Sequence, residues 1–266
     1  MSHDGVRELV AASRGLFDLR GRVALVVGGA EGLGQAIACG LAMSGAKVAI
    51  ADLDGELARD TAERIAGATS AATTSLTLDV RDEQRVDEVV GAAAEWGGSL
   101  DIAFNLAGIN DRRPALELGL ADFTRVLDVN LMGLYSCCRA IGRRMVPQGR
   151  GKLINVASIF GHVAARDQAA YAASKGGVVQ LSRVLAHEWA EHGIQVNSLS
   201  PAHIRTRLAA PVLDDPATSA WVGSRILRGE PGEPWEIIGP ALFLAGDASN
   251  FVTGTSLVVD GGWLAG

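Results

Sequence analysis

Three side chains between Lys152 and Gly177 have the chemistry to move a proton to or from an alcohol. Tyr171 and Lys175 stand four residues apart in a helical pattern, so both fall on one face of the helix. A phenol has an ordinary pKa near ~10, and a neighbouring ammonium favours the phenolate and moves its pKa toward the working range. Ser158, at the end of a predicted buried strand, would hold a substrate oxygen beside the phenol. The three residues predict acid–base chemistry at an alcohol or carbonyl group.

A glycine-rich turn follows the first predicted strand. Residues 22–27 form an apolar run, typical of a strand buried on both faces of a parallel sheet, and a helical pattern covers 35–44. Between a strand and a helix start, backbone amides and the positive helix end face an approaching anion. We therefore expect the pyrophosphate of a dinucleotide at this turn. The expected cofactor contacts here are Gly28, Glu31, Gly32, Leu33 and Gly34.

Asp52 ends the second predicted strand, residues 47–51, and bears on the choice of cofactor. A carboxylate there can bond both ribose hydroxyls of NAD and repel the 2'-phosphate of NADP. Glu31 adds a second negative charge, so we predict NAD rather than NADP. The alternative is that Asp52 and Asp54 only cap the next helix.

Strands and helices alternate along the rest of the chain. Further strands are expected at 74–78, 101–105, 152–158, 193–199 and 256–259, and helices at 55–66, 82–94, 121–145 and 234–245. This predicts an α/β fold: a single-domain, Rossmann-type doubly wound parallel sheet of about seven strands with helices on both faces. Residues 1–15 should form a flexible N-terminal extension of the domain 16–266. Residues from about 205 to 230 are irregular and should form a mobile lid over the substrate.

The set of motifs resembles the short-chain dehydrogenase/reductase family. The resemblance rests on the step from Ser158 to Tyr171 and Lys175, and on VGGAEGLG (27–34), FNLAG (104–108) and DVNLMG (128–133). It implies an NAD-dependent oxidoreductase for alcohols and ketones, in which Lys175 also binds the nicotinamide ribose. It further implies a homotetramer built through the long helices.

The resemblance assigns roles to residues at other strand ends. Asn130 would hold a water that connects Lys175 to bulk solvent for proton relay. Asp79 and Val80 would contact adenine, and Ile204 and Thr206 would approach the nicotinamide. The remaining expected cofactor contacts are Leu53, Asn105, Ala107, Gly108, Tyr171, Lys175, Pro201 and Ala202.

Three residues depart from the family pattern. Val27 stands where the family usually has Thr, Leu106 where a second Asn is common, and Ala202 where Gly usually follows Pro201. Val27 removes a hydroxyl that would brace the glycine turn, and Ala202 adds a methyl near the nicotinamide. These changes bear on cofactor affinity and placement, whereas the catalytic side chains are all present.

Four basic residues are candidates for substrate contacts: Arg112, Arg113, His162 and His203. Paired guanidinium groups near the site suit a carboxylate or a polyhydroxylated substrate, or else a solvated loop or a subunit contact. The histidines follow strand ends and could touch substrate hydroxyls or be ordinary loop residues. Because this region is similar to sugar-acid dehydrogenases of the family, we expect a sugar acid, a sugar or a polyol.

Composition narrows the other function classes. A net charge of −6 over 266 residues argues against nucleic acid as the main partner. The sequence has no apolar run of membrane-spanning length and no signal peptide at its start. We therefore expect a cytoplasmic location and no membrane partner. No metal is expected, since His187 and His192 stand five apart and do not share a helix face. The alternatives are an NADP-dependent ketoacyl or other carbonyl reductase, or a non-catalytic nucleotide-sensing protein.

Overall fold

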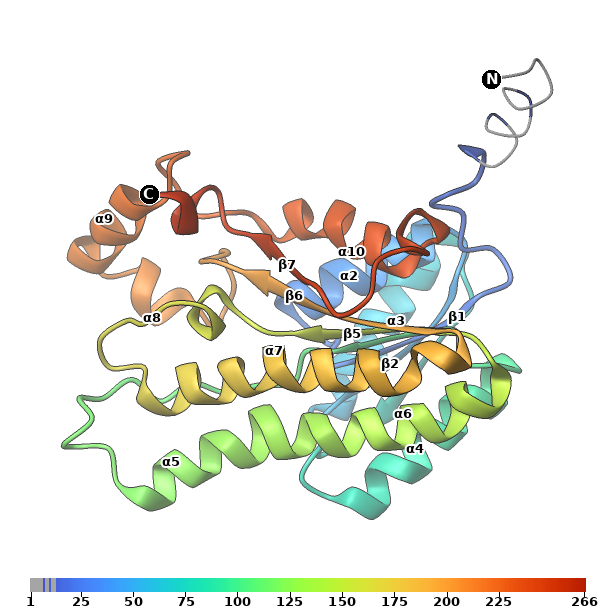
Figure 1. The fold of residues 1–266 in the computed structure, drawn as a ribbon, viewed down its shortest axis with the longest axis horizontal. Helices are drawn as coiled ribbons and strands as arrows, with labels where there is room; N and C mark the ends of the chain where they lie inside the picture. Colours follow the sequence, from blue (N-terminus) through green and yellow to red (C-terminus); the bar gives the residue numbers. More distant parts are fainter. Residues whose placement is uncertain (1–6, 8–9, 11–12) are drawn as a thin grey trace.

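A parallel sheet of seven strands in the order β3-β2-β1-β4-β5-β6-β7 runs through the molecule (Figure 1). The computed structural model describes residue 7, residue 10 and residues 13–266. The strands are β1 (Val23–Val27), β2 (Lys47–Asp52), β3 (Thr73–Thr77), β4 (Ile102–Asn105), β5 (Gly151–Val156), β6 (Ile194–Pro201) and β7 (Ser256–Val259). The predicted fold class is confirmed. The order reverses between β1 and β4, which opens a crevice at the carboxyl ends of these strands.

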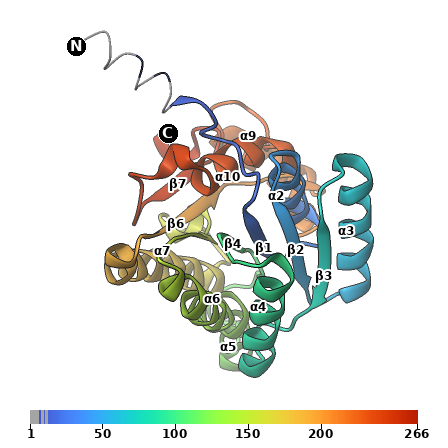
Figure 2. The same ribbon diagram turned by 90° about the vertical axis from the view of Figure 1, so that its right-hand side faces the viewer.

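The apolar strand sequences follow from burial on both faces of the sheet. All five residues of β1 and all six of β5 are buried. One core cluster packs β1 and β4 against helices α4 (Glu83–Gly97), α6 (Leu134–Gln148) and α7 (Ala169–Trp189). The other packs the opposite face against α2 (Gly32–Met43), α3 (Gly55–Thr69) and α10 (Ile238–Ala245). Figure 2 shows these two helical layers on either side of the sheet.

Aspartates begin two of the helices on these faces. The carboxylate of Asp54 accepts the Leu57 amide at 3.0 Å at the start of α3. That of Asp82 accepts the Arg85 amide at 3.0 Å at the start of α4. Each cap satisfies an amide that the helix itself leaves free, so these polar residues mark the helix starts in the sequence.

The helix expected over 121–145 is present, with a π-helical segment inside it. The structure has α5 (Leu120–Leu127), a π-helical segment (Asp128–Gly133) and then α6. A π turn accommodates an extra residue and rotates the side chains around it. Here it places Asn130 in the interior with no exposed surface. The expected long helix is therefore confirmed, and the π-helical segment within it is what the sequence pattern did not predict.

The segment expected to be an irregular lid contains two helices, α8 (Ala210–Leu213) and α9 (Pro216–Arg225). Asp215 begins α9 by accepting the Thr218 amide at 2.8 Å. Val222 of α9 packs on Trp263 of the C-terminal turn, and Figure 1 shows α9 beside the C-terminus. The lid function remains a prediction. The predicted N-terminal extension falls largely outside the described residues.

Within the described part of the chain, no helix combines the length and the hydrophobicity that crossing a membrane requires.

Candidate active site

A cleft of about 550 Å³ lies at the carboxyl ends of the strands and collects most of the predicted site residues. It extends from the glycine turn at one end to the α7 residues and the α8 segment at the other. The predicted residues that line it are Gly28, Glu31, Gly32, Leu33, Gly34, Asp52, Leu53, Asp79, Val80, Ala107, Gly108, Arg112, Ser158, Tyr171, Lys175, Pro201, Ala202, His203, Ile204 and Thr206. The carboxyl edge of the parallel sheet thus gathers residues from distant parts of the chain.

The glycine turn has the geometry of a cradle for an anion. Gly28 and Gly32 have φ angles of 77° and 57°, which side chains disfavour. A Cβ atom on Gly34 would lie 2.0 Å from the Gly28 carbonyl oxygen, so the turn closes only without one. The residue that precedes α2, Glu31, makes no side-chain cap. The first amides of α2 therefore face the cleft without a capping side chain, which fits a dinucleotide pyrophosphate.

Asp52 connects the end of β2 to this turn. Its carboxylate accepts the Ala30 amide at 3.0 Å and the Asp54 amide at 3.3 Å, and it lines the cleft. The alternative that Asp52 caps the next helix is wrong, since Asp54 alone holds that position. Its place beside the glycine turn is that of a group able to meet the adenosine ribose.

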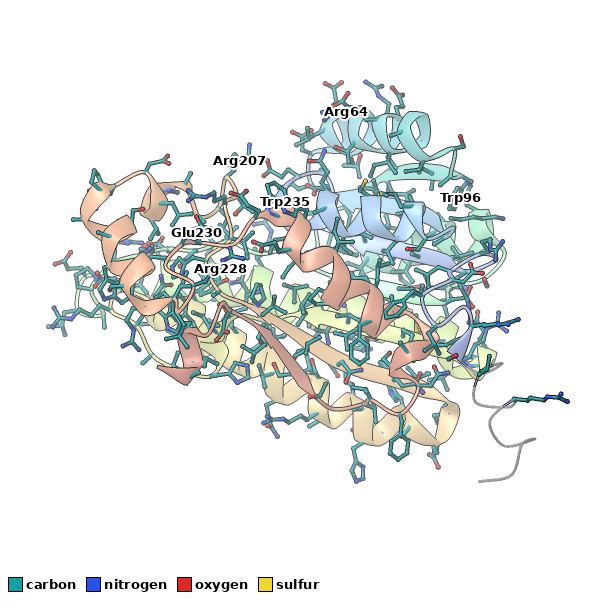
Figure 3. All side chains as sticks on the ribbon, turned by 90° about the horizontal axis from the view of Figure 1, so that it is seen from above. Arg64, Trp96, Arg207, Arg228, Glu230 and Trp235 are labelled. Carbon is teal, nitrogen blue, oxygen red and sulfur yellow. The ribbon has the colours of Figure 1, made fainter. Side chains whose placement is uncertain are left out.

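Arg207 was not predicted as a site residue, and it changes the charge at this end of the cleft. Arg207 lies on the loop between β6 and α8 (Figure 3), and its guanidinium pairs with the Glu31 carboxylate at 2.7 Å. It also lines a shallow groove with Asp52 and Arg59. The negative charge expected from Glu31 is therefore partly neutralised. No local motif signals this pair, because its members are brought together only by the fold.

The three predicted catalytic groups converge near the centre of the cleft. Tyr171 and Lys175 share one face of α7, and the Lys175 Nζ atom lies 5.6 Å from the centre of the Tyr171 ring. The Ser158 hydroxyl, two residues after β5, accepts the Phe160 amide at 3.2 Å. Lys175 is 3% exposed and donates to the Val156 carbonyl oxygen at 2.8 Å. That bond holds the ammonium beside the Tyr171 ring.

Burial governs the protonation of these groups. It raises the pKa of Tyr171, and the Ser158 hydroxyl acts in the opposite direction. Burial also lowers the pKa of Lys175 to about 8. In this state of the protein the net shift of the Tyr171 pKa is upward, because burial disfavours the charged phenolate. The expected lowering of that pKa by Lys175 stays a prediction.

The Asn130 side chain hydrogen-bonds the loop after β4 and does not line the cleft. Its side-chain oxygen accepts the Ile109 amide at 2.8 Å, and its nitrogen donates to the Ile109 carbonyl at 2.9 Å. The same nitrogen donates to the Ser174 hydroxyl at 3.1 Å, one residue before Lys175. Asn130 thus links the π-helical segment, a cleft loop and α7. Its role in holding a relay water stays a prediction.

Comparison with known proteins identifies the family to which this site belongs. A family model described as enoyl-(acyl carrier protein) reductase matches residues 28–264. The chain also shares 40% identity over 247 residues with D-threitol dehydrogenase of Mycolicibacterium smegmatis, covering 93% of this chain and 94% of that protein. This chain belongs to the short-chain dehydrogenase/reductase family. It is an oxidoreductase that acts on CH–OH groups.

Other relatives agree in fold and length. Gluconate 5-dehydrogenase of Gluconobacter oxydans is 35% identical over 247 residues, covering 93% of this chain and 96% of that protein. The solved structure of a gluconate 5-dehydrogenase from Burkholderia cenocepacia, in complex with NADP and tartrate, has a TM-score of 0.91 and 36% identity. It covers 96% of this chain and 99% of that chain.

Asn105 requires a correction in this short-chain dehydrogenase. It was expected to contact the cofactor, but its side chain is buried between β4 and β5. Its nitrogen donates to the Asn155 side-chain oxygen at 2.9 Å, and it does not line the cleft. The last residue of a strand can face either side of the sheet, and its direction here is set by the neighbouring strand.

Two of the four basic substrate candidates lie outside the cleft. Arg113 pairs with Asp111 at 2.6 Å and with Asp122 at 2.7 Å, so its charge is already satisfied. His162 is exposed, and its ring lies 3.0 Å from the hydroxyls of Ser200 and Ser256. Both predicted substrate contacts are corrected, since local partners hold these side chains elsewhere.

Arg112 and His203 do line the cleft of the dehydrogenase. His203 is 8% exposed, with its ring 5.7 Å from Phe160 and 5.1 Å from Trp263, measured between ring centres. Burial, aided by the nearby Arg112 charge, lowers the pKa of His203 to about 4. The imidazole is therefore neutral at pH 7 and can serve as a hydrogen-bonding group.

Two further polar residues in the cleft were missed from the sequence, Asn110 and Gln168. Gln168 lies three residues before Tyr171 and Asn110 two after Gly108. Their nearness to recognised motifs is the only signal that the sequence offers. The cleft is also lined by the three residues that depart from the family pattern, Val27, Leu106 and Ala202.

Proposed function

We propose that this protein oxidises a secondary alcohol of a polyhydroxylated substrate to a ketone, and catalyses the reverse reduction. The observation that carries the proposal is the meeting of Tyr171, Ser158 and Lys175 in the same cleft as the glycine turn. Relatives named D-threitol dehydrogenase and gluconate 5-dehydrogenase support a polyol, sugar or sugar acid as substrate.

Each catalytic residue has one task in the proposed mechanism. Ser158 orients the substrate oxygen, and Tyr171 as phenolate removes the hydroxyl proton. The Lys175 ammonium, held by the Val156 carbonyl oxygen at 2.8 Å, stabilises the phenolate electrostatically and bonds the nicotinamide ribose. A bound nicotinamide dinucleotide supplies the acceptor for the hydride. In the reduction, protonated Tyr171 returns the proton to the forming alkoxide.

Replacing Tyr171 with phenylalanine tests this mechanism. Tyr171→Phe should lower kcat by about 10²- to 10⁴-fold, the usual range for removing a general acid–base group, while dinucleotide affinity stays near that of the parent. Tyr135→Phe is the matched control, because Tyr135 is the other tyrosine and is 41% exposed on α6. Turnover is followed by absorbance of the reduced cofactor and binding by calorimetry. Substantial turnover in Tyr171→Phe would refute the role.

NAD is our proposed cofactor, on the strength of Asp52 at the end of β2. Three solved relatives contain bound NADP, so the preference between NAD and NADP needs a direct test. Asp52→Ser combined with Glu31→Arg removes two carboxylates and adds a guanidinium beside Arg207. The ratio of kcat/KM for NAD to that for NADP should fall at least ~tenfold, since repulsion of a 2'-phosphate is removed. A parent enzyme that already prefers NADP would contradict the assignment.

We propose a homotetramer in a reducing, cytoplasmic compartment. Met132, Tyr135 and Val184 are exposed apolar residues of the long helical segments through which family members are expected to associate. Cys39, Cys137 and Cys138 are free thiols, which suits a reducing compartment. Light scattering on the purified protein measures the assembly, and a monomer at micromolar concentration would contradict it.

A further inference from the structure

Unpaired polar atoms concentrate in the cleft. Within the described residues, five buried side-chain atoms lack a hydrogen-bond partner. Three of the five belong to residues that line the cleft, namely Asn110, Gln168 and His203. A buried polar group without a partner costs free energy, so native proteins retain few of them. The unpaired atoms themselves have almost no accessible surface, so a ligand in the cleft would meet the other polar atom of each side chain, or the unpaired one after the side chain turns.

All three side chains are tied to the catalytic residues. Gln168 is 2% exposed and precedes α7, and its carbonyl oxygen accepts the Ala172 amide at 2.8 Å. It therefore stands one helical turn before Tyr171. His203 packs edge-on against Phe160, whose amide donates to the Ser158 hydroxyl. Both residues are therefore connected to the segments that carry Tyr171 and Ser158.

Asn110 is positioned by the same framework on the other side of the cleft. It adjoins Ile109, whose amide and carbonyl are both bonded to the Asn130 side chain. Asn130 in turn bonds Ser174 of α7. The loop that carries Asn110 is thereby linked through Asn130 to the helix that carries Tyr171.

The chemistry of these groups selects hydroxyls. The unpaired atoms are the side-chain oxygens of Asn110 and Gln168 and the Nδ1 atom of His203. A half-turn of the terminal amide exchanges its oxygen and nitrogen, so each amide presents an acceptor or a donor. A hydroxyl both donates and accepts and satisfies either end. A carboxylate has no proton to give and satisfies only the donors.

The cations near Asn110, Gln168 and His203 are poorly placed to bind a substrate carboxylate. Arg113 and Arg125 are held by Asp111, at 2.6 and 2.9 Å. Arg112 lines the cleft but is exposed, where a pair with a carboxylate contributes little. Lys175, the buried cation of the cleft, is bonded to the protein beside Tyr171. The buried contacts are therefore all uncharged, apart from this catalytic lysine.

We propose that Asn110, Gln168 and His203 determine specificity by binding hydroxyls on the carbons beside the reacting one, and that the substrate is a neutral polyhydroxylated alcohol. This inference rests on the proposed dehydrogenase function and names the substrate class of that site. It makes the three residues specificity-determining contacts, separate from the acid–base set of Ser158 and Tyr171.

A series of alcohols with increasing numbers of hydroxyls tests the proposal. The substrates are 2-butanol, 2,3-butanediol and threitol, assayed with NAD and NADP by absorbance of the reduced cofactor. Each neighbouring hydroxyl should raise kcat/KM by about tenfold, the effect of one well-made neutral hydrogen bond in a buried site. Equal values across the series would overturn the inference and leave the dehydrogenase function standing. No turnover of any of the three would count against the proposed function itself.

Two conservative variants locate the effect. Gln168→Met and His203→Phe keep the shape of each side chain and remove its hydrogen-bonding ends. Each should lower kcat/KM for threitol by about tenfold and leave that for 2-butanol within twofold. Gln180→Met is the control, since Gln180 is exposed on the same helix. An equal loss for 2-butanol and threitol would show a structural role and overturn the assignment.

Binding without turnover provides a second readout. Calorimetry of threitol with Tyr171→Phe and oxidised cofactor should show binding that weakens about tenfold on adding Gln168→Met. Unchanged binding would overturn the contact. Threonate, which carries a carboxylate in place of one terminal alcohol, tests the neutral character. A preference of tenfold or more for threonate, abolished by Arg112→Gln, would overturn the neutral-polyol assignment.

Discussion

At the scale of residues, the proposed role of Tyr171 depends on its protonation state, which should affect the rates of oxidation and reduction differently. Burial raises the pKa of Tyr171 and lowers that of Lys175 to about 8. The phenol is then protonated at neutral pH in the protein without cofactor, which suits a proton donor for ketone reduction. Alcohol oxidation needs the phenolate, and the fraction of phenolate rises with pH until the Tyr171 pKa is reached.

The pH dependence of the two directions should therefore differ. For oxidation, kcat/KM should rise between pH 7 and pH 9 with a slope approaching about tenfold per pH unit, because each unit below the pKa reduces the phenolate tenfold. For reduction, it should stay level or fall over the same range. Initial rates in both directions, in buffers of matched ionic strength, measure this. A flat profile for oxidation would show that the phenol is already ionised at pH 7.

At the scale of elements, two local backbone features position the site. The glycine turn between β1 and α2 brings main-chain amides to the cleft, and the π-helical segment before α6 turns Asn130 inward. The turn depends on the absence of a side chain at Gly34, where a Cβ atom would lie 2.0 Å from a carbonyl oxygen. Within the π-helical segment, the Asn130 side chain makes two hydrogen bonds to the backbone of Ile109.

Replacing two helical glycines with alanine distinguishes the effect of a steric clash at the glycine turn from the general effect of alanine on helix stability. Gly34→Ala should cost about 1–3 kcal/mol of folding stability, as overpacking does, and weaken dinucleotide binding because the turn must open. Gly67→Ala is the control, since no atom lies within 4 Å of its added Cβ in α3. It should stabilise the protein by roughly 0.5–1 kcal/mol. Urea unfolding and calorimetric titration with the dinucleotide measure both, and equal effects at the two sites would contradict the explanation.

At the scale of the whole molecule, the sheet separates the cleft from a second buried cation. Lys152 stands near the start of β5, at the amino end of the strand, and Ser158 follows the other end. Its Nζ atom lies 2.8 Å from the Asn250 side-chain oxygen and 3.2 Å from the Ser249 hydroxyl. These bonds join the central sheet to the turn after α10. Burial lowers the pKa of Lys152 to about 8, against an opposing effect of Asp247.

Lys152 should make the stability of the fold rise with pH above about 8. Below pH 8 the lysine is charged in both states, so the cost of burying the ammonium is fully present. Between about 8 and the unfolded value near ~10.4 the folded state releases its proton first, and the unfolded state binds more protons. The difference is on the order of 2 kcal/mol. Lys175 contributes with the same sign.

Lys152→Met removes this contribution and provides its measurement. Urea unfolding of the parent and of Lys152→Met at pH 7.5, 9 and 10 should give a smaller rise in the free energy of unfolding for the variant. Lys47→Met is the control, because Lys47 is an exposed lysine at the start of β2. Parallel pH profiles for the parent and Lys152→Met would contradict the assigned pKa.

Local pattern was sufficient to predict that Tyr171, Lys175, Asp52 and the glycine turn would line one cleft. Tyr171 and Lys175 share a helix face because of their spacing, and Asp52 and the glycine turn follow strands whose apolar sequences are plain. The order of elements also determined the parallel sheet. These features depend on periodicity over a few neighbouring residues, so they can be read directly from the sequence. Ends of elements shifted by a few residues, as expected where caps and tertiary contacts decide them.

Only the tertiary structure decided which polar groups meet and how they are charged. Asn110, Gln168 and His203 come from three separate loops, and the chain gives no spacing that would join them. Arg113 was expected near substrate and is instead held by two aspartates. The direction of the Tyr171 pKa shift likewise depends on how far the surrounding elements exclude water. The burial of a side chain and its pairing with other charges depend on neighbours that are distant in sequence. They are therefore determined only when the chain has folded.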